Sequence, residues 1–593
     1  MSGRTVCRVP RPQRLVRRNL NAGLVLASAA AVLGGCATAP PSTPAAGPSA
    51  ATVPPLDTRG TPAQRERPLH DVLSFLGAPA DPESLAPVRL PEPRRVGPDL
   101  GPAATGLASP AGVERPDPRA RPSAKQPVDA AAAPLPAVPA TGWPGTGRDD
   151  RSADRDPLRI GPVELRFGYE ATAERRLNFD LNAARNRDRR TVDQEAKFGL
   201  RWQPAEHWWL MAEAAWVQES RHQPATGVRD RREAHERGEL WVMTDRFLGL
   251  PVAWQIGRVP LAERRAWWWD DELDAMRWVI AGSDWRLDTG FGRELARSAG
   301  DEPHLDPAQR GVWRWFGQAR WDWRAQQRLE AFWLVVDDGS GRPLPGQRVA
   351  ATDLDVEDAR LTWLGLRASG RGPRWAAIGA PRIEYWADLA WLEGHRWTTA
   401  FGSAAGDGAR PAGASQRRPV RGHAWDLAVQ ARWTDLPLQP GLALAWARGS
   451  GGAPGDPVDR TFRQTGLHEN KTRFNGVKRL ERYGQLFDPE LANLEVRTLG
   501  TGVRLGSSAS VELVWHHYRQ RLAQPGVVGA RLSQAPAGLQ RGLGQEVDLF
   551  FAWRESAQWE LTLALSRFWP GPAYAANRRD PAQAVELGAA FNF

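Results

Sequence analysis

The last ten residues of the chain, A-V-E-L-G-A-A-F-N-F, alternate between apolar and polar positions. From Val585 to Phe593 every second residue is apolar, and Glu586 and Asn592 lie among the residues between them. One face of such a strand suits lipid and the other suits a wet lumen, provided that every backbone group pairs within a closed sheet. The pattern is typical of the closing strand of a bacterial outer-membrane barrel, and it predicts a membrane location and a pore.

The same alternation recurs upstream, in the segments 163–170, 425–433, 547–553 and 559–566. A soluble β-sandwich with one wet face is the alternative, but the number of strands, their tryptophan-tipped ends and an export signal favour a membrane barrel. The region from 161 to 593 has room for about 16 to 18 strands of roughly ten residues plus loops. We therefore expect an all-β fold, a transmembrane antiparallel β-barrel of about 18 strands, with an even strand number.

Tryptophan is unusually frequent, with 29 Trp against 17 Phe and 5 Tyr. Because the amphipathic indole ring favours the membrane–water boundary, the excess predicts aromatic girdles at the two rims of a barrel. We place Trp267, Trp268 and Trp269 in such a girdle, with sugar stacking as the alternative for this run.

The N-terminus has the organisation of an export signal. Arginines up to Arg18 precede an apolar run over 22–35, and L-G-G-C at 33–36 resembles a lipobox. We expect a lipoprotein signal peptide over 1–35 and an acylated Cys36, the alternative being an ordinary signal cut near Ala39. Much of the net charge of +10 lies in this signal, so the basicity is no evidence for a nucleic-acid partner.

Residues 36–160 are rich in Pro, Ala and Gly, and cannot bury enough apolar surface to offset the entropy of ordering. We interpret this segment as a disordered periplasmic tether. Apolar residues between Leu69 and Leu76 have helical spacing, which fits a transient helix or a docking helix for a periplasmic secretion component.

No motif in the chain indicates catalysis: G-x-S-x-G, H-E-x-x-H and the P-loop are all missing from the sequence. We expect no enzyme, no cofactor and no metal. His516 and His517 lie in an alternating strand, so one should face each side rather than form a metal pair. Asp337 and Asp338 precede Gly-Ser-Gly and mark a loop, with a calcium site as the weaker alternative.

Several blocks resemble the alginate export family of outer-membrane barrels. They include W-A-R-G-S-G-G at 446–452, F-R-Q-T-G-L-H-E-N-K-T-R-F-N-G-V-K-R-L-E-R-Y-G at 462–484 and P-E-L-A-N-L at 489–494. I-G-R-V-P-L-A-E-R-R-A-W-W-W-D at 256–270 and G-Q-E-V-D-L at 544–549 belong to the same set. The similarity runs in order over 162–593 and does not cover 1–161.

This resemblance implies an 18-stranded barrel whose narrow pore is lined by arginine and lysine and exports an anionic polyuronate, alginate or a relative. Cations in a constriction select carboxylates, and Arg can bind both carboxylate oxygens at once. The alternatives are an uptake or general porin for small organic anions, and an adhesin or assembly protein anchored by its barrel.

Matching the family's motifs onto this chain implies a set of pore residues. They are Arg166, Arg201, Asp270, Arg293, Lys471 and Arg479. The alternation of apolar and polar residues independently places Arg166 and Arg201 on the lumen side of their strands. A one-residue gap in the motif match leaves Arg482 as an alternative to Arg479.

The chain also departs from the family pattern at basic positions. Gly238, Pro260 and Thr562 stand where the family has cations, and Arg237 lies one residue early. The late turn at 554–558 is short, whereas the corresponding turn in the alginate exporter is long enough to act as a plug. These departures predict a pore with fewer strand-borne cations and without that plug.

Overall fold

The computed structural model describes residues 158–593, except 186, 303, 405–407 and 556–557, and the side chain of Ala377. The signal peptide, Cys36, the tether and the Leu69–Leu76 segment lie outside the described residues. Within the described part of the chain, no helix is long and apolar enough to cross a membrane.

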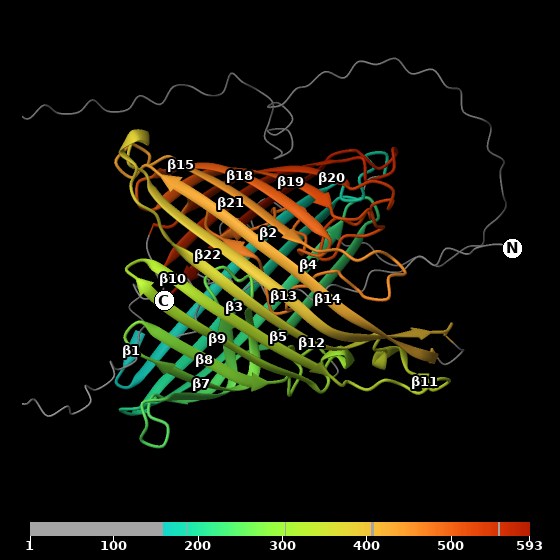
Figure 1. The fold of residues 1–593 in the computed structure, drawn as a ribbon, viewed down its shortest axis with the longest axis horizontal. Helices are drawn as coiled ribbons and strands as arrows, with labels where there is room; N and C mark the ends of the chain where they lie inside the picture. The colour runs from blue at the N-terminus through green and yellow to red at the C-terminus, as the bar shows by residue number, and fades with distance from the viewer. Residues whose placement is uncertain (1–157, 186, 303, 405–407, 556–557) are drawn as a thin grey trace, which may run out of the picture. The chain divides into compact units, whose positions relative to one another are not determined.

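The described residues form a closed antiparallel β-barrel (Figure 1). Of the 20 strands in the main sheet, β1 and β11 lie outside the ring, which leaves 20 − 2 = 18 barrel strands. The ring consists of β2 (Val163–Leu177), β3 (Arg189–Ala205), β4 (Trp208–Gln223), β5 (Val228–Thr244), β6 (Ala253–Ala262), β7 (Asp270–Ala281), β8 (Trp285–Gly292), β9 (Val312–Arg324), β10 (Gln327–Asp338), β12 (Glu357–Arg371), β13 (Arg382–Phe401), β14 (Arg410–Arg432), β15 (Gly441–Gly449), β18 (Leu494–Leu505), β19 (Ala509–Gln520), β20 (Gly542–Trp553), β21 (Trp559–Pro570) and β22 (Ala582–Asn592).

The last strand closes the ring onto the first. β22 pairs antiparallel with β2, from Gly168 opposite Asn592 to Leu177 opposite Gln583, so the ring has no free edge. The expected barrel and its strand number are therefore confirmed. The remaining elements are β1 (Leu158–Ile160), β11 (Arg348–Val349), β16 (Lys471–Thr472), β17 (Leu480–Glu481) and the 3-10 helices η4 (Pro307–Gln309), η5 (Ala351–Asp353) and η6 (Ala376–Ile378).

Alternation sorts the side chains of each strand onto two faces. Leu364 and Leu366 on β12 face outward and are 55% and 51% exposed. The next residue, Arg367, faces inward and is 3% exposed. Leu587 on β22 is 53% exposed, as its place on the apolar face predicts. The exposed leucines and tryptophans form an outer belt suited to lipid, because the backbone behind them is fully paired within the sheet.

The two ends of the barrel differ. β2 begins and β22 ends at one end, where the connections are short, such as 206–207, 325–326 and 554–558. The longer connections, including 293–311, 450–493 and 521–541, are at the other end (Figure 1). Outer-membrane barrels have short periplasmic turns and long extracellular loops, so we assign the turn-bearing end to the periplasm. The short turn at 554–558 agrees with the sequence analysis.

One of these long connections, residues 450–493, folds back into the lumen, and we call it the inserted loop. Its strands β16 and β17 pair with each other, and Thr472 and Leu480 on them are buried. The backbone N–H of Asn475 donates to Glu512 at 2.8 Å, and Arg504 donates to the carbonyl of Asn475 at 3.0 Å. Glu512 and Arg504 lie near the periplasmic ends of β19 and β18, so a loop that starts outside reaches most of the way through the barrel.

Candidate functional site

Three arginines surround one carboxylate at the periplasmic mouth. Arg166 lies 2.7 Å from Glu164, Arg201 lies 3.7 Å away and Arg159 lies 3.9 Å away. Phe167 and Phe198 pair across β2 and β3 on the lipid face, so the adjacent Arg166 and Arg201 face the lumen as parity predicts. Three guanidinium groups therefore share the Glu164 carboxylate.

Similar clusters, with two cations around one carboxylate, recur around the periplasmic mouth. Arg371 and Arg382 flank Glu384 at 3.2 and 2.6 Å, and Arg320 and Arg328 flank Asp322 at 2.6 and 2.8 Å. The other two clusters are Arg277 and Arg286 around Asp288, and Lys478 and Arg554 around Glu560. We call the clusters centred on Glu164, Asp288, Asp322, Glu384 and Glu560 the basic mouth.

Sequence reasoning found Arg166 and Arg201 but missed the rest of the basic mouth. The alternation along the strands could have placed Arg371 and Arg382 in the lumen, because they lie on the same inward faces of β12 and β13 as Arg367 and Asp388. Lys478 carried no such signal, because it belongs to the inserted loop. It donates to Thr562 at 3.5 Å, so the loop brings a cation beside the position where the strand lacks one.

Three of the predicted pore residues come together deeper in the lumen. Asp270, the first residue of β7, lies 3.7 Å from Arg479 of the inserted loop, and its backbone N–H donates to the carbonyl of Leu467, also in that loop, at 2.6 Å. Lys471 on β16 forms an ion pair with Glu469. Burial disfavours the Lys471 ammonium, but attraction to Glu469 and Glu481 outweighs burial and raises the pKa of Lys471, so this buried lysine stays charged.

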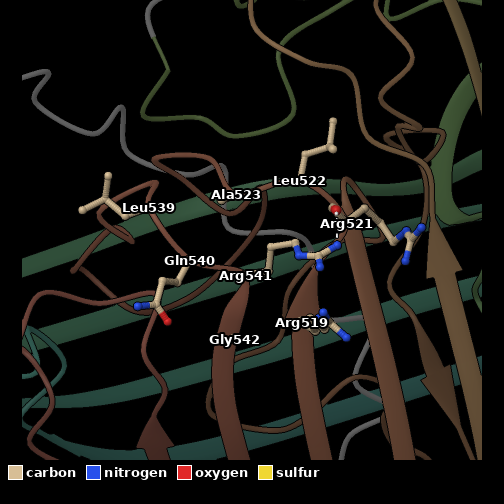
Figure 2. Close-up of a pocket in the computed structure, with 8 residues that line it drawn as sticks. All are labelled: Arg519, Arg521, Leu522, Ala523, Leu539, Gln540, Arg541 and Gly542. Atoms are coloured by element: carbon tan, nitrogen blue, oxygen red, sulfur yellow. Dashed lines mark hydrogen bonds between the residues drawn. The ribbon is translucent and has the colours of Figure 1, made fainter.

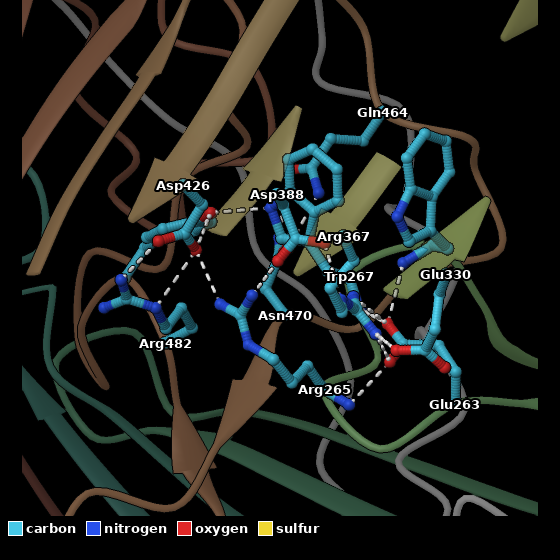
Figure 3. A network of polar contacts seen from close by, with 12 residues as sticks. Glu263, Arg265, Trp267, Glu330, Arg367, Asp388, Asp426, Gln464, Asn470 and Arg482 are labelled. Atoms are coloured by element: carbon cyan, nitrogen blue, oxygen red, sulfur yellow. Dashed lines mark hydrogen bonds and ion pairs between the residues drawn. The ribbon is translucent and has the colours of Figure 1, made fainter. Parts of the chain in front are cut away.

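A buried network of charges fastens two loops to the barrel wall (Figure 3). Arg265, in the connection 263–269, pairs with Asp388 and lies 2.8 Å from Asp426. Arg482 of the inserted loop binds Asp426 through two nitrogens, at 2.6 and 3.1 Å. Arg482 is 1% exposed and anchors the inserted loop to the wall. Of the two alternatives left by the motif match, Arg479 is the one that lies beside Asp270.

Glu263 and Arg367 complete this network. Glu263 accepts hydrogen bonds from the backbone of Trp267 at 2.6 Å and from the Arg367 side chain at 2.5 and 3.1 Å. Burial alone would raise the pKa of Glu263, but Arg367 outweighs burial and lowers the pKa to about 2. The carboxylate therefore stays charged at all physiological pH values and holds the turn at 263–269 in place.

The assignment of Trp267, Trp268 and Trp269 to a membrane girdle is wrong. They are 2%, 1% and 4% exposed and lie inside the barrel. Trp268 stacks on Phe332 at 5.0 Å, and a Cβ added to Gly365 would lie 1.8 Å from the Trp268 ring. The girdle interpretation failed because these tryptophans belong to a loop that folds inward, where they pack against the inserted loop.

Arg293 lies apart from the other predicted pore residues. Its guanidinium is 4.9 Å from the ring centroid of Trp313 at the extracellular end of the barrel. Trp313 is exposed on the outer face of β9, in the same row as Trp315. The structure therefore brings Asp270, Lys471 and Arg479 together, places Arg166 and Arg201 at the periplasmic mouth, and leaves Arg293 outside both groups.

Two further sequence expectations concern metal-type ligands. His516 is 1% exposed on the inner face, 3.7 Å from Asp548, whereas His517 pairs outward against Arg497, so the two histidines face opposite sides as expected. Asp338, Asp355 and Asp358 gather around the Ser340 hydroxyl oxygen, which lies 2.7, 2.6 and 3.1 Å from one carboxylate oxygen of each. The hydroxyl has one proton and can donate to only one of the three at a time, and the cluster has the oxygen ligands that calcium prefers.

A protein-family model described as alginate export matches residues 162–586. The alginate production protein AlgE of Pseudomonas aeruginosa is 29% identical over 299 residues, covering 50% of this chain and 58% of that protein. AlgE of Pseudomonas syringae pv. tomato is 26% identical over 333 residues, covering 52% and 63%. The aligned region thus spans about three fifths of the length of these relatives.

Among solved structures, the chain is similar to two Pseudomonas aeruginosa proteins. OccK5 (OpdH) has a TM-score of 0.42 and 10% identity, covering 72% of this chain and 98% of that one. OpdQ has a TM-score of 0.44 and 8% identity, covering 73% and 99%.

Proposed function

This chain belongs to the alginate export family, and on that premise we propose that it is an outer-membrane channel through which an anionic polyuronate, alginate or a relative, leaves the periplasm. The channel would bind and release the polymer without chemical turnover. The observation that carries this proposal is the basic mouth, in which each carboxylate is shared by two or more cations.

The basic mouth faces the periplasm, the compartment from which an exported polymer approaches. Several of its cations remain accessible: the side chains of Arg166 and Arg371 are 39% and 40% exposed. A single exposed pair contributes little because water screens it. Several clusters in which cations outnumber the carboxylate, set in a low-dielectric wall, focus the electric field and attract polyanions. Because each contact is weak, the polymer can move from one cluster to the next.

The inserted loop would form the narrow part of the path. Lys471 and Arg479 lie on it, and the ion pairs of Arg482 and Arg265 fix its position against the wall. We propose Asp270 as the residue that orients Arg479 toward the path, and Arg166 and Arg201 as the first residues met by carboxylates.

Replacing Arg166 and Arg201 together by serine tests the proposal. Of the three arginines around Glu164 only Arg159 would then remain, so the cluster should lose two of its three positive charges. In planar bilayers with a salt gradient, we expect a lower anion-to-cation permeability ratio and weaker block by oligouronates. Because the two side chains face water, the barrel should still fold, as heat-modifiable mobility on gels would report.

The matched control is Arg175→Ser with Arg190→Ser. Arg175 and Arg190 lie opposite each other on the same two strands but on the outer face. The control therefore replaces the same number of arginines as the test variant does. The control should keep the selectivity of the natural protein. A folded Arg166/Arg201 variant with unchanged reversal potential and unchanged oligouronate block would contradict a selecting role for the basic mouth.

A further inference from the structure

The outward rows of four strands end in arginines where the row of leucines and tryptophans stops. On β15 the outward row runs Leu444, Trp446, Arg448, and on β19 it runs Trp515, His517, Arg519. Arg497 on β18 and Arg567 on β21 occupy the corresponding outward rows. β15, β18 and β19 are consecutive in the ring and β21 follows after β20, so the arginines form a band near the extracellular end that is interrupted at β20.

The neighbouring tryptophans indicate the depth of this band. Arg497 lies 5.9 Å from the ring centroid of Trp446, and Arg567 lies 5.1 Å from that of Trp569. Trp446 is itself 41% exposed on the lipid face. Because exposed indole rings favour the membrane–water boundary, guanidinium groups beside them lie at the level of lipid headgroups.

Between β19 and β20 the band deepens into a pocket of about 510 Å³. Its lining combines Arg519, Arg521 and Arg541 with Leu522 and Leu539 (Figure 2). Arg541 donates to the backbone carbonyl of Arg521 at 3.4 Å, which holds the two loop ends together. Leu539 is 84% exposed, so apolar side chains stand beside the cations. We call Arg448, Arg497, Arg519, Arg521, Arg541 and Arg567 the outer collar.

The outer collar has few carboxylates to balance it. Glu495 pairs with both Arg497 and Arg521, at 3.0 and 3.5 Å. Arg519 and Arg541 have no carboxylate within ion-pair distance among the residues that the structure describes. Two other outward arginines at this end each have a carboxylate partner: Arg360 pairs with Asp337 at 2.7 Å and Arg421 with Glu393 at 3.7 Å.

We propose that the outer collar binds the phosphate groups of a phosphorylated glycolipid in the outer leaflet of the membrane. Planar guanidinium groups suit phosphate oxygens, which they can bind two at a time. The collar belongs to the outward rows that continue the lipid-facing belt, so its neighbours are lipid headgroups rather than the polymer in the lumen.

Lipid retention by the purified full chain tests this proposal. The protein is incubated in detergent micelles doped with a bisphosphorylated acylated disaccharide lipid or with its dephosphorylated form, and bound lipid is measured after affinity purification. We expect about tenfold more retention of the phosphorylated lipid. Arg519→Ser with Arg541→Ser should remove most of this difference, and Arg519→Lys with Arg541→Lys should restore part of it because the charge remains.

The matched control is Arg360→Ser with Arg421→Ser, two outward arginines of the same end that already have carboxylate partners, and it should retain lipid like the natural protein. Equal retention of the two lipids, or unchanged retention by the folded Arg519/Arg541 serine variant, would overturn the proposal. Displacement of the lipid by millimolar inorganic phosphate would indicate a free-anion site instead, and displacement by oligouronate would indicate a polymer site. Neither result would depend on pore selectivity, so this inference and the proposed function can fail separately.

Discussion

Asp426 accepts hydrogen bonds from side chains of two different loops. Arg265 comes from the connection 263–269, whereas Arg482 and Tyr483 come from the inserted loop, and Tyr483 donates at 3.0 Å. In the dry interior of the barrel such a carboxylate needs its partners, because removing one partner of a buried pair leaves an uncompensated charge. A single strand residue therefore contacts both loops in the lumen.

Replacing Arg482 by leucine should release the inserted loop. Breaking a buried ion pair costs about 3–5 kcal/mol, somewhat less here because Arg265 remains beside Asp426. We expect faster trypsin cleavage within residues 450–493 and larger or noisier single-channel conductance. Limited proteolysis followed by mass spectrometry locates the cuts.

Arg374→Leu serves as the control for that experiment. Arg374 lies in the connection between β12 and β13 and pairs with Asp435 at 3.5 Å on the surface. Exposed pairs of this kind contribute about 0–1 kcal/mol, so its cleavage pattern should not change. Equal protease resistance of the Arg482 variant and this control would show that the Asp426 contacts do not hold the loop.

At the level of the elements, each strand divides its residues between lipid and lumen. Leu364 lies at the centre of β12 on the outer face, and its neighbour Gly365 faces inward beneath Trp268. Contact with lipid therefore constrains Leu364, whereas the packing of the loop that carries Trp268 constrains Gly365. Substitutions one residue apart on the same strand should therefore fail for different physical reasons.

Leu364→Arg should impair insertion of the barrel. A charge that faces the bilayer midplane costs about 2–4 kcal/mol, and Leu364 is both central in its strand and fully outward. We expect a lower free energy of unfolding in vesicles and a smaller heat-modifiable fraction. Urea titration followed by tryptophan fluorescence measures the first quantity.

Leu248→Arg provides the comparison at an exposed leucine outside the bilayer. Leu248 is 83% exposed in the periplasmic connection between β5 and β6, where a charge stays in water. Its effect should stay within about 0.5 kcal/mol, as for other surface substitutions. A loss of stability as large as that of Leu364→Arg would contradict the assignment of the outer belt to lipid.

At the scale of the whole molecule, the barrel is an outer-membrane protein of the alginate export family with charges arranged by compartment. The basic mouth faces the periplasm and the outer collar faces the opposite leaflet. The segment before the barrel lies outside the described residues, and for it we propose acylation of Cys36 and a tether over 36–160 that docks a periplasmic partner through 69–76.

Radiolabelled palmitate should label the natural chain and not Cys36→Ala, because the acyl chains are carried on a glyceryl group that is joined to the cysteine sulfur by a thioether. Gel fluorography of the purified protein gives the result. The barrel itself should still reach the outer membrane in the variant, since its belt inserts without an acyl chain. Equal labelling of both chains would end the proposal of a lipid anchor.

The sequence by itself determined the fold class, the strand number within its predicted range and the direction of side chains such as Arg166, Arg201 and His516. These features follow from a period of two residues, which is local and can be read along the chain, although for His516 and His517 it predicted only that they face opposite sides. The family resemblance also located Asp270, Lys471 and Arg479, which the structure brings together although they lie far apart in sequence.

Only the tertiary structure decided what fills the lumen. Trp268 packs beneath Gly365, Arg482 pairs with Asp426, and Lys478 reaches Glu560, and each contact joins a loop to a distant strand. A loop has no periodicity that tells which way it folds, so the same tryptophan run fitted a membrane girdle equally well. Its direction was decided by the closure of the ring, which brought buried carboxylates from several strands within reach of arginines on the loops.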